Sequence, residues 1–186
     1  MSYTFSSFAA NTNKEANRMT DFKYDRVREQ ILEASRRIFS KFGFRKATMD
    51  EIAKAARKGK STLYYYFKNK EDVFEAVVHY ESNTMKYRLL EVIGTDIPPP
   101  EKLKAYIKER IKAFKEFGNF YDALKDDYLK HMEFIEKIRE KYDRDELTLI
   151  KMILMEGAEQ KIFRQDGIDE AAEAILIALK GLEMSL

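Results

Sequence analysis

The chain of 186 residues contains no cysteine, and its three prolines stand together at positions 98–100. Without cysteine there is no disulfide framework and no thiol chemistry, which is compatible with a reducing cytoplasm. No apolar run approaches the roughly 18 residues that a membrane-spanning helix needs. The N-terminus also lacks the basic region followed by an apolar region that marks a signal peptide. These absences predict a cytoplasmic protein without a membrane partner.

Catalytic motifs are missing as well. The sequence has no Gly-x-Ser-x-Gly, no phosphate loop, no His-Glu-x-x-His and no cysteine ligand set. The two histidines, His79 and His131, are isolated in sequence. Asp126 and Asp127 are adjacent, and adjacent residues of a helix point apart, so they indicate a solvated face rather than a catalytic pair. We therefore expect no enzyme activity, no cofactor and no metal.

Apolar residues recur at helical spacing through most of the chain, and no segment favours a strand. The fold class is therefore all-α. Helices are expected from 21 or 24 to 42, from 48 to 56, around 60–67, and at 70–93, 101–117, 120–142, 143–163 and 170–181. Gly43 and Gly94 are expected to end their helices. The first helix should bury Val27, Ile31, Ala34, Ile38 and Phe42, and the helix at 101–117 should bury Leu103, Ile107, Ile111 and Phe114.

The segment 47–74 carries the most specific pattern, a short helix, a tight turn and a second short helix. Thr48 and Glu51 have the spacing of a capping box, which begins a helix. Met49, Ile52, Ala53 and Ala56 then form one apolar face. Gly59 can open the next helix or shape the turn before it. Leu63 and Phe67 lie four residues apart and would anchor the second helix to the first.

The outer face of that second helix is rich in hydroxyl and basic groups. An α-helix fits the major groove of DNA, where side chains read base edges, and hydroxyls and amines also bind phosphates. Between residues 20 and 70 there are fourteen Lys and Arg against six Asp and Glu, an excess of eight positive charges, whereas residues 71–186 carry an excess of seven negative charges. A basic head on an acidic body indicates a polyanionic partner for the head.

This polarity also divides the chain. We expect a flexible arm at residues 1–19, a helix-turn-helix DNA-binding domain at 20–70 and a helical effector-binding and dimerisation domain at 71–186. Two alternatives remain open. The helix-turn-helix could dock on protein rather than on DNA. Its residues would also fit a plain structural role, because consecutive tyrosines can be core and lysine-rich faces are usually only solvated. An enzyme of nucleic-acid metabolism would need clustered carboxylates or a metal set, which are not apparent.

The residues of the head resemble those of the TetR family of bacterial transcriptional repressors over about 27–74. The resemblance is carried by the following groups: Ile31-Leu32-Glu33-Ala34, Phe39, Phe42-Gly43-Phe44, Ala47-Thr48, Ile52-Ala53, Thr62-Leu63-Tyr64-Tyr65-Tyr66-Phe67 and Lys70. It implies a three-helix head and a C-terminal helical bundle that binds a ligand and dimerises. It also implies double-stranded DNA, a small-molecule effector and a second copy of the chain as partners.

The resemblance further assigns the DNA contacts. The expected DNA-binding residues are Thr48, Lys58, Gly59, Lys60, Ser61, Thr62, Tyr64, Tyr65, Tyr66 and Lys70. Where family members often have Gly-Val-Ser in the turn, this chain has Arg57-Lys58-Gly59. A glycine in place of a serine cap costs only a few tenths of a kcal/mol. The stem of Lys58 can still cover apolar surface.

The resemblance also implies an apolar cavity in the body. A lipophilic or aromatic effector is preferred, and the acidic surroundings leave room for a cationic one. The candidate pocket residues are Met85, Phe114, Phe117, Tyr121, Tyr128, His131, Phe134, Met152 and Met155. The last helix carries a small and aliphatic stripe that suits helix pairing between two copies, formed by Ala171, Ala174, Ile175, Ala178 and Leu182. The alternative is that this stripe is ordinary core. Only one helix of the expected dimer pair is predicted to be complete, so either the body is short or the native chain continues past Leu186. The resulting hypothesis is a ligand-responsive repressor of a pseudo-palindromic operator.

Overall fold

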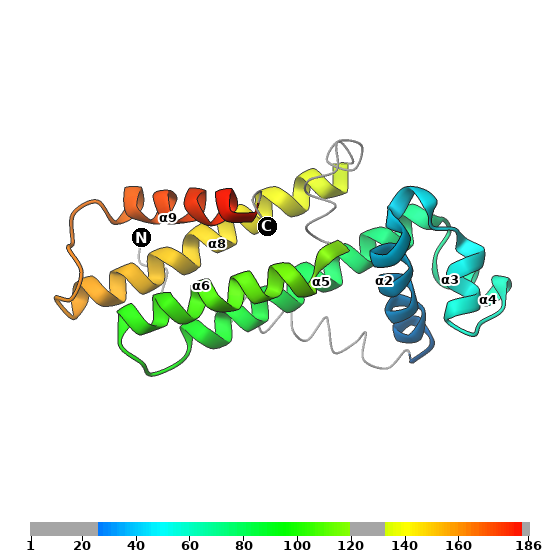
Figure 1. Ribbon diagram of the computed structural model, residues 1–186, viewed down its shortest axis with the longest axis horizontal. Helices are drawn as coiled ribbons and strands as arrows, with labels where there is room; N and C mark the ends of the chain where they lie inside the picture. The colour runs from blue at the N-terminus through cyan, green and yellow to red at the C-terminus, as the bar shows by residue number, and fades with distance from the viewer. Residues whose placement is uncertain (1–25, 120–132, 184–186) are drawn as a thin grey trace. The chain divides into compact units, whose positions relative to one another are not determined.

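The computed structural model describes residues 26–119 and 133–183, and all regular structure within those ranges is helical (Figure 1). The chain divides into two compact units, residues 1–73 and 74–186, which we call the head and the body. The predicted N-terminal arm lies outside the described residues, as do most of the predicted helix at 120–142 and three of the pocket candidates: Tyr121, Tyr128 and His131.

The head consists of α2 (Arg26–Lys46), α3 (Met49–Ala55), α4 (Lys60–Tyr66) and the first turn of α5 (Lys70–Ile93). The prediction that Phe42 belongs to the buried stripe of the first helix is wrong, because its side chain is 39% exposed. Gly43 has φ +72° and interrupts the helical backbone, so the chain turns there and buries Phe44 instead. Phe44 then packs against Phe39, with 6.1 Å between the ring centroids.

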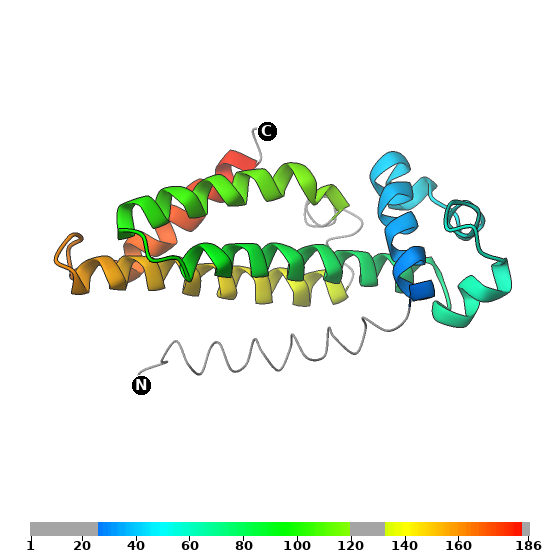
Figure 2. The ribbon, with the colours of Figure 1, turned by 90° about the horizontal axis from the view of Figure 1, so that it is seen from below.

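The body contains the rest of α5 together with α6 (Pro99–Glu116), α8 (Glu133–Glu159) and α9 (Ile168–Glu183). Helix α8 packs against both α6 and α9. Figure 2 shows α8 alongside the body part of α5, to which the ion pair of Asp145 with Lys86 joins it. The predicted helix boundary at Asp143 is wrong, because α8 runs through it. Asp143 and Asp145 form ion pairs with Lys180 at 2.6 Å and Lys86 at 2.9 Å, so these carboxylates join helices instead of capping one. None of the described helices combines the length and apolarity needed to cross a lipid bilayer.

Helix α6 turns a different face to the core from the one predicted. The expected inward residues, Leu103, Ile107, Ile111 and Phe114, are only half-buried. The buried positions of α6 are Pro99, Lys102, Tyr106, Arg110 and Ala113. Two acidic residues of α8 explain this choice, because Glu146 binds Arg110 and Glu156 binds Lys102 across the interface. Apolar periodicity on α6 alone cannot show these partners.

Gly157 allows the chain after α8 to fold back on the helix. A Cβ at this position would lie 2.1 Å from Cδ2 of Phe163, well inside van der Waals contact. We expect Gly157→Ala to lower the free energy of unfolding by about 1–3 kcal/mol, the usual cost of overpacking. Urea denaturation followed by circular dichroism measures the change. In a Phe163→Ala background the same substitution should cost nothing, and an equal cost in both backgrounds would contradict the explanation.

Candidate DNA-binding surface

Helix α3 begins at the predicted capping box, which is confirmed. The backbone N–H of Glu51 donates to Oγ1 of Thr48 at 3.3 Å, and the backbone N–H of Thr48 donates to Oε2 of Glu51 at 2.9 Å. The hydroxyl of Thr48 also donates to the same carboxylate at 2.8 Å. Thr48 is exposed, so the cap fixes the start of α3 while leaving its residue on the surface. Ile52 and Ala53 are buried on the opposite face, as predicted.

The turn between α3 and α4 has its left-handed residue at Arg57, with φ +54°. Its backbone N–H donates to the carbonyl of Lys54 at 3.1 Å, and that of Lys58 donates to the carbonyl of Ala53 at 3.0 Å. Lys58 is half-buried, in keeping with a stem that covers apolar surface. Gly59 has φ −68° and is the N-cap of α4 without a side-chain cap bond. The conformational freedom of glycine is therefore needed at position 57, not at position 59.

We expect Arg57→Gly to stabilise the head by about 0.5–1 kcal/mol. A left-handed conformation costs a residue with a Cβ about 1–2 kcal/mol, and the greater freedom of glycine in the unfolded chain offsets part of that gain. Thermal unfolding of the full chain measures the effect. The matched control is Arg37→Gly at an exposed position inside α2, which should destabilise the head, since glycine within a helix costs about 1 kcal/mol. A destabilising Arg57→Gly would show that the arginine side chain contributes more than its backbone strain costs.

Helix α4 has one face buried against the head and an opposite face that is exposed. Leu63 is fully buried and Phe67 is 4% exposed, which confirms both predicted anchors. On the other side Tyr65 is 82% exposed and Tyr64 is 48% exposed, so the interpretation of the tyrosines as ordinary core fails for these two. The remaining α4 candidates are exposed at Lys60 and Ser61 and half-buried at Thr62 and Tyr66. The predicted recognition residues of α4 are therefore at least partly accessible.

Two cations of this surface have partners in the protein. The ammonium of Lys60 lies 2.7 Å from the carboxylate of Asp50 on α3, and this hydrogen bond raises the pKa of Lys60. Lys70 donates to the backbone carbonyl of Arg45 at 3.4 Å, and its ammonium lies 4.5 Å from the ring centroid of Phe44. Sequence reasoning missed Asp50, because no periodicity relates it to Lys60 on the next helix. Lys70 contributes to the packing of the head as well as to its charge.

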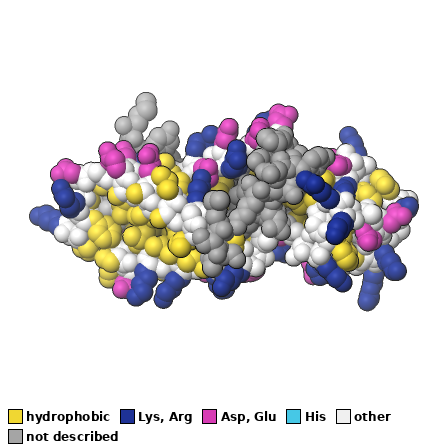
Figure 3. Space-filling model, turned by 45° about the horizontal axis from the view of Figure 1, so that its top comes forward, with side chains coloured by type: hydrophobic (Ala, Val, Ile, Leu, Met, Phe, Trp, Pro, Cys, Tyr) yellow, Lys and Arg dark blue, Asp and Glu magenta, His cyan; other side chains and the backbone are white. Residues whose placement is uncertain are grey.

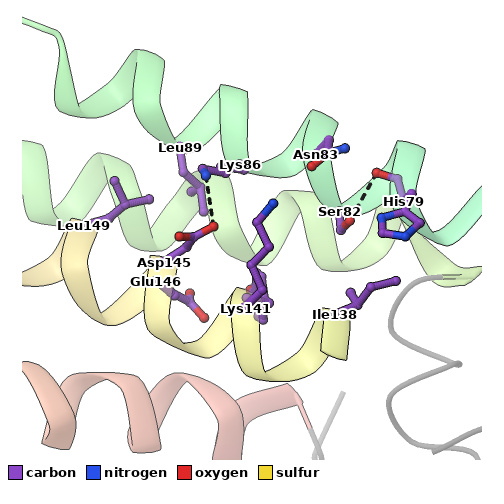
Figure 4. Close-up of a pocket in the computed structure, with 11 residues that line it drawn as sticks. His79, Ser82, Asn83, Lys86, Leu89, Ile138, Lys141, Asp145, Glu146 and Leu149 are labelled. Carbon is purple, nitrogen blue, oxygen red and sulfur yellow. Dashed lines mark hydrogen bonds and ion pairs between the residues drawn. The ribbon is translucent and has the colours of Figure 1, made fainter. Parts of the chain in front are cut away.

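The body has a small cavity of about 40 Å³ between α5 and α8. Its wall combines apolar side chains such as Leu89, Ile138 and Leu149 with the cations Lys86 and Lys141 (Figure 4). Burial lowers the pKa of His79, which also lines this cavity, despite the opposing effect of Glu75. None of the pocket candidates that the structure describes is among the residues that line it.

The described pocket candidates are distributed over several parts of the body. Met85 and Phe117 are buried, and Phe114, Phe134 and Met152 are half-buried. Phe134 packs edge-on against Phe74, with ring centroids 6.5 Å apart. Met155 is 51% exposed. Their role in effector binding stays a prediction.

Helix α9 presents opposite faces to the core and to solvent. Its buried residues are Ala172, Leu176 and Leu179. The predicted dimer stripe lies elsewhere on the helix, and its members Ala171, Ala174, Ala178 and Leu182 are exposed, with Ile175 half-buried. Ile177 adds a side chain that is 69% exposed. The alternative that this stripe is ordinary core is therefore wrong, and Figure 3 shows apolar side chains gathered on the surface of the body. Helices α8 and α9 are both long and pack together, and the expectation that only one helix of the dimer pair is complete stays a prediction.

Known proteins share this head and this fold. Residues 31–77 match the family described as "Bacterial regulatory proteins, tetR family". An uncharacterized HTH-type transcriptional regulator of Bacillus subtilis, YhgD, is 29% identical over 68% of this chain and 66% of its own length. The HTH-type transcriptional repressor NicS of Pseudomonas putida is 31% identical over 60% of this chain and 46% of its own. The chain thus spans about half to two thirds of the length of these relatives.

A similarity of the whole fold extends the match beyond the head. A transcriptional regulator from Cytophaga hutchinsonii has a crystal structure that superposes on this one with a TM-score of 0.74 and 31% sequence identity. The similarity covers 84% of this chain and 80% of the other. The matched residues 31–77 include α3, α4 and the turn described above. The chain belongs to the TetR family of bacterial regulatory proteins.

Proposed function

We propose that this protein is a homodimeric transcriptional repressor that a small molecule releases from a pseudo-palindromic operator. The observation that carries the proposal is the open surface of α4, where Lys60, Ser61 and Tyr64 are exposed above the buried anchor Leu63. Such a helix can enter the major groove, and two copies in a dimer read half-sites about 34–36 Å apart or at multiples of that spacing. The repressor name of the relative NicS supports the direction of regulation.

The test is selection from a randomised DNA duplex pool, followed by fluorescence anisotropy on the enriched sequence at two salt concentrations. We expect a pseudo-palindrome and a steep loss of affinity with salt, because each phosphate contact releases counterions. Thr62→Ala should change which sequences are preferred, and Ser40→Ala on an exposed position of α2 should change nothing. A folded dimer that enriches no sequence and binds a protein partner at high salt would favour the protein-docking alternative.

Dimerisation is proposed through the outer face of α9. Its exposed members combine small residues, which let helices approach closely, with the aliphatic side chains Ile177 and Leu182. An exposed apolar surface of this kind is typical of a protein–protein interface. The ion pair between Lys180 and Asp143 at 2.6 Å connects α9 to α8, so both helices would present the interface as one unit.

We expect Ile177→Glu to convert the dimer to a monomer, since a carboxylate would be desolvated without a partner in the interface. Analytical ultracentrifugation at micromolar concentration measures the change. Operator affinity should fall together with the dimer fraction. Ile97→Glu, the same change at an exposed position between α5 and α6, is the matched control and should remain dimeric. A dimeric Ile177→Glu protein would place the interface elsewhere.

Effector response is proposed to act through α5, which begins in the head at Lys70 and continues in the body to Ile93. The cavity of about 40 Å³ beside this helix is far smaller than the roughly 300–1,000 Å³ of ordinary ligand sites. A ligand would therefore have to prefer a different arrangement of the body helices. That preference is what switching requires, because a ligand that binds both states equally shifts neither.

A further inference from the structure

The centre of the body contains a carboxylate held by three donors from α6. Arg110 and Glu146 are each 1% exposed. Arg110 donates from Nε to Oε1 of Glu146 and from Nη2 to Oε2 at 3.0 Å. The hydroxyl of Tyr106 donates to the same Oε1 at 3.2 Å. Tyr106 and Arg110 lie four residues apart, so one face of α6 presents both side chains to one carboxylate.

Packing alone does not account for this arrangement. A buried ion pair often contributes no more to stability than apolar side chains of the same volume would. Helix α6 has such side chains available, since Leu103, Ile107 and Ile111 lie half-buried on a neighbouring face. The structure nevertheless buries the face that carries the guanidinium. The fork of a guanidinium binds carboxylates in two parallel hydrogen bonds, and its geometry does not depend on which molecule supplies the carboxylate.

Glu146 also connects this cluster to the cavity of the body. It contributes to the wall of the cavity between α5 and α8, together with Lys86 and Lys141. Its carboxylate points away from the ion pair of Lys86 with Asp145 (Figure 4). The wall thus carries two ammonium groups and two carboxylates, those of Asp145 and Glu146, and Ile138 provides an apolar part of it.

We propose that Tyr106 and Arg110 form the anion subsite of the effector site, that the carboxylate of Glu146 fills this subsite in the effector-free protein, and that the effector is an apolar carboxylate that takes its place. The inference rests on the ligand-responsive function proposed above. The exchange keeps the guanidinium paired but removes a link between α6 and α8. The ligand thereby prefers the state in which these helices are separated at Glu146, which supplies the differential affinity that a switch needs.

The first experiment removes the carboxylate of Glu146 from the subsite and tests whether a small carboxylate can replace it. In the full chain, Glu146→Ala removes the internal carboxylate, and acetate or propionate is then added at constant ionic strength. We expect either anion to raise the melting temperature of this variant in a saturable manner by several degrees, with little effect on the wild type. Methylammonium chloride should have no such effect. Glu156→Ala, which removes the partner of Lys102 across the same two helices, is the matched control and should not be rescued.

The second experiment does not depend on that variant folding. Calorimetry compares octanoate, octanol and octylammonium as ligands of the wild-type chain, of the double variant Arg110→Met/Glu146→Met and of the control Lys102→Met/Glu156→Met. We expect the wild type and the control to bind octanoate in preference to the other two. The Arg110 double variant should bind octanoate about tenfold more weakly or worse, as the loss of hydrogen bonds to a charged group implies.

Several outcomes would overturn the assignment. These are equal binding of the alcohol or the amine, unchanged octanoate affinity in the Arg110 double variant, or absence of both carboxylate rescue and octanoate binding. Calorimetry needs no DNA, so it tests the anion subsite independently of the proposed repressor function. If the chain binds octanoate at Arg110 but selects no DNA duplex, the proposed anion subsite stands and the proposed operator binding is contradicted. If the chain binds an operator but does not respond to carboxylates, operator binding stands and the anion subsite is contradicted.

Discussion

Leu63→Ala is expected to abolish operator binding by unfolding the head. Leu63 is fully buried beneath α4, and truncating such a side chain removes both its burial and the packing around it. The usual cost is about 2–5 kcal/mol, which is a large part of the roughly 5–15 kcal/mol that stabilises a natural domain. Since α4 has no side-chain N-cap and only seven residues, packing of this leucine supplies much of what keeps it helical.

The measurement combines urea denaturation with anisotropy on the selected operator. We expect the head to unfold at a lower urea concentration. Once the unfolded head is the more stable state, each further 1.4 kcal/mol of destabilisation should lower DNA affinity by at least about tenfold. Tyr65→Ala is the control on the same helix. Tyr65 is 82% exposed, so its loss should weaken binding and leave the urea transition in place. A Leu63→Ala head as stable as the wild type would mean that α4 is held by other contacts.

Glu146→Leu should be the most destabilising single change in the body. It leaves the guanidinium of Arg110 in a site that is 1% exposed, without the carboxylate that accepts two of its hydrogen bonds. Removal of one partner from a buried ion pair typically costs about 3–5 kcal/mol. Tyr106 loses its acceptor on Glu146 at the same time. The free energy of unfolding, measured by denaturant titration of the full chain at fixed protein concentration, should fall accordingly.

The double variant Arg110→Met/Glu146→Met should recover most of that loss, because neither charge then remains buried. The comparison of the single and the double variant separates the net contribution of the ion pair to stability from the destabilisation caused by leaving one charge buried alone. For contrast, Glu133→Leu breaks an exposed pair with Lys137 at 2.6 Å and should change stability by less than about 1 kcal/mol. A Glu146→Leu protein as stable as the wild type would show that water or another group replaces the carboxylate, and would remove the physical basis for an occupied anion subsite.

Local signals in the sequence were sufficient to predict most of the head. The capping box of Thr48 and Glu51, the anchors Leu63 and Phe67, and α5 at 70–93 all follow from contacts within a few residues along the chain. Such signals depend on hydrogen bonds and side-chain pairs at fixed helical spacing, so a sequence displays them directly. The predicted stripe of α2 is the exception. Val27 and Ile38 are only half-buried, and the choice between Phe42 and Phe44 depends on the backbone conformation of Gly43.

Sequence patterns were less informative about the body, because its helices are matched by charge across the interfaces. Apolar periodicity placed Leu103 and Ile107 inside, whereas the structure buries Lys102, Tyr106 and Arg110. A helix with an apolar face and a charged face can turn either toward the core, and the partner helix decides. The boundary predicted at Asp143 failed for a related reason, since an aspartate can cap a helix or pair across helices.

The sequence by itself therefore determined the fold class, the helix-turn-helix segment and the family, because these depend on local spacing and on the polarity of charge along the chain. Only the tertiary structure decided that the stripe of α9 faces outward, that Asp50 holds Lys60 and that Glu146 occupies the donors of Tyr106 and Arg110. The two pairings join residues from different helices, and the exposure of the α9 stripe depends on which face of the helix packs against the body. Such arrangements follow from how the helices pack, which no short stretch of sequence encodes alone.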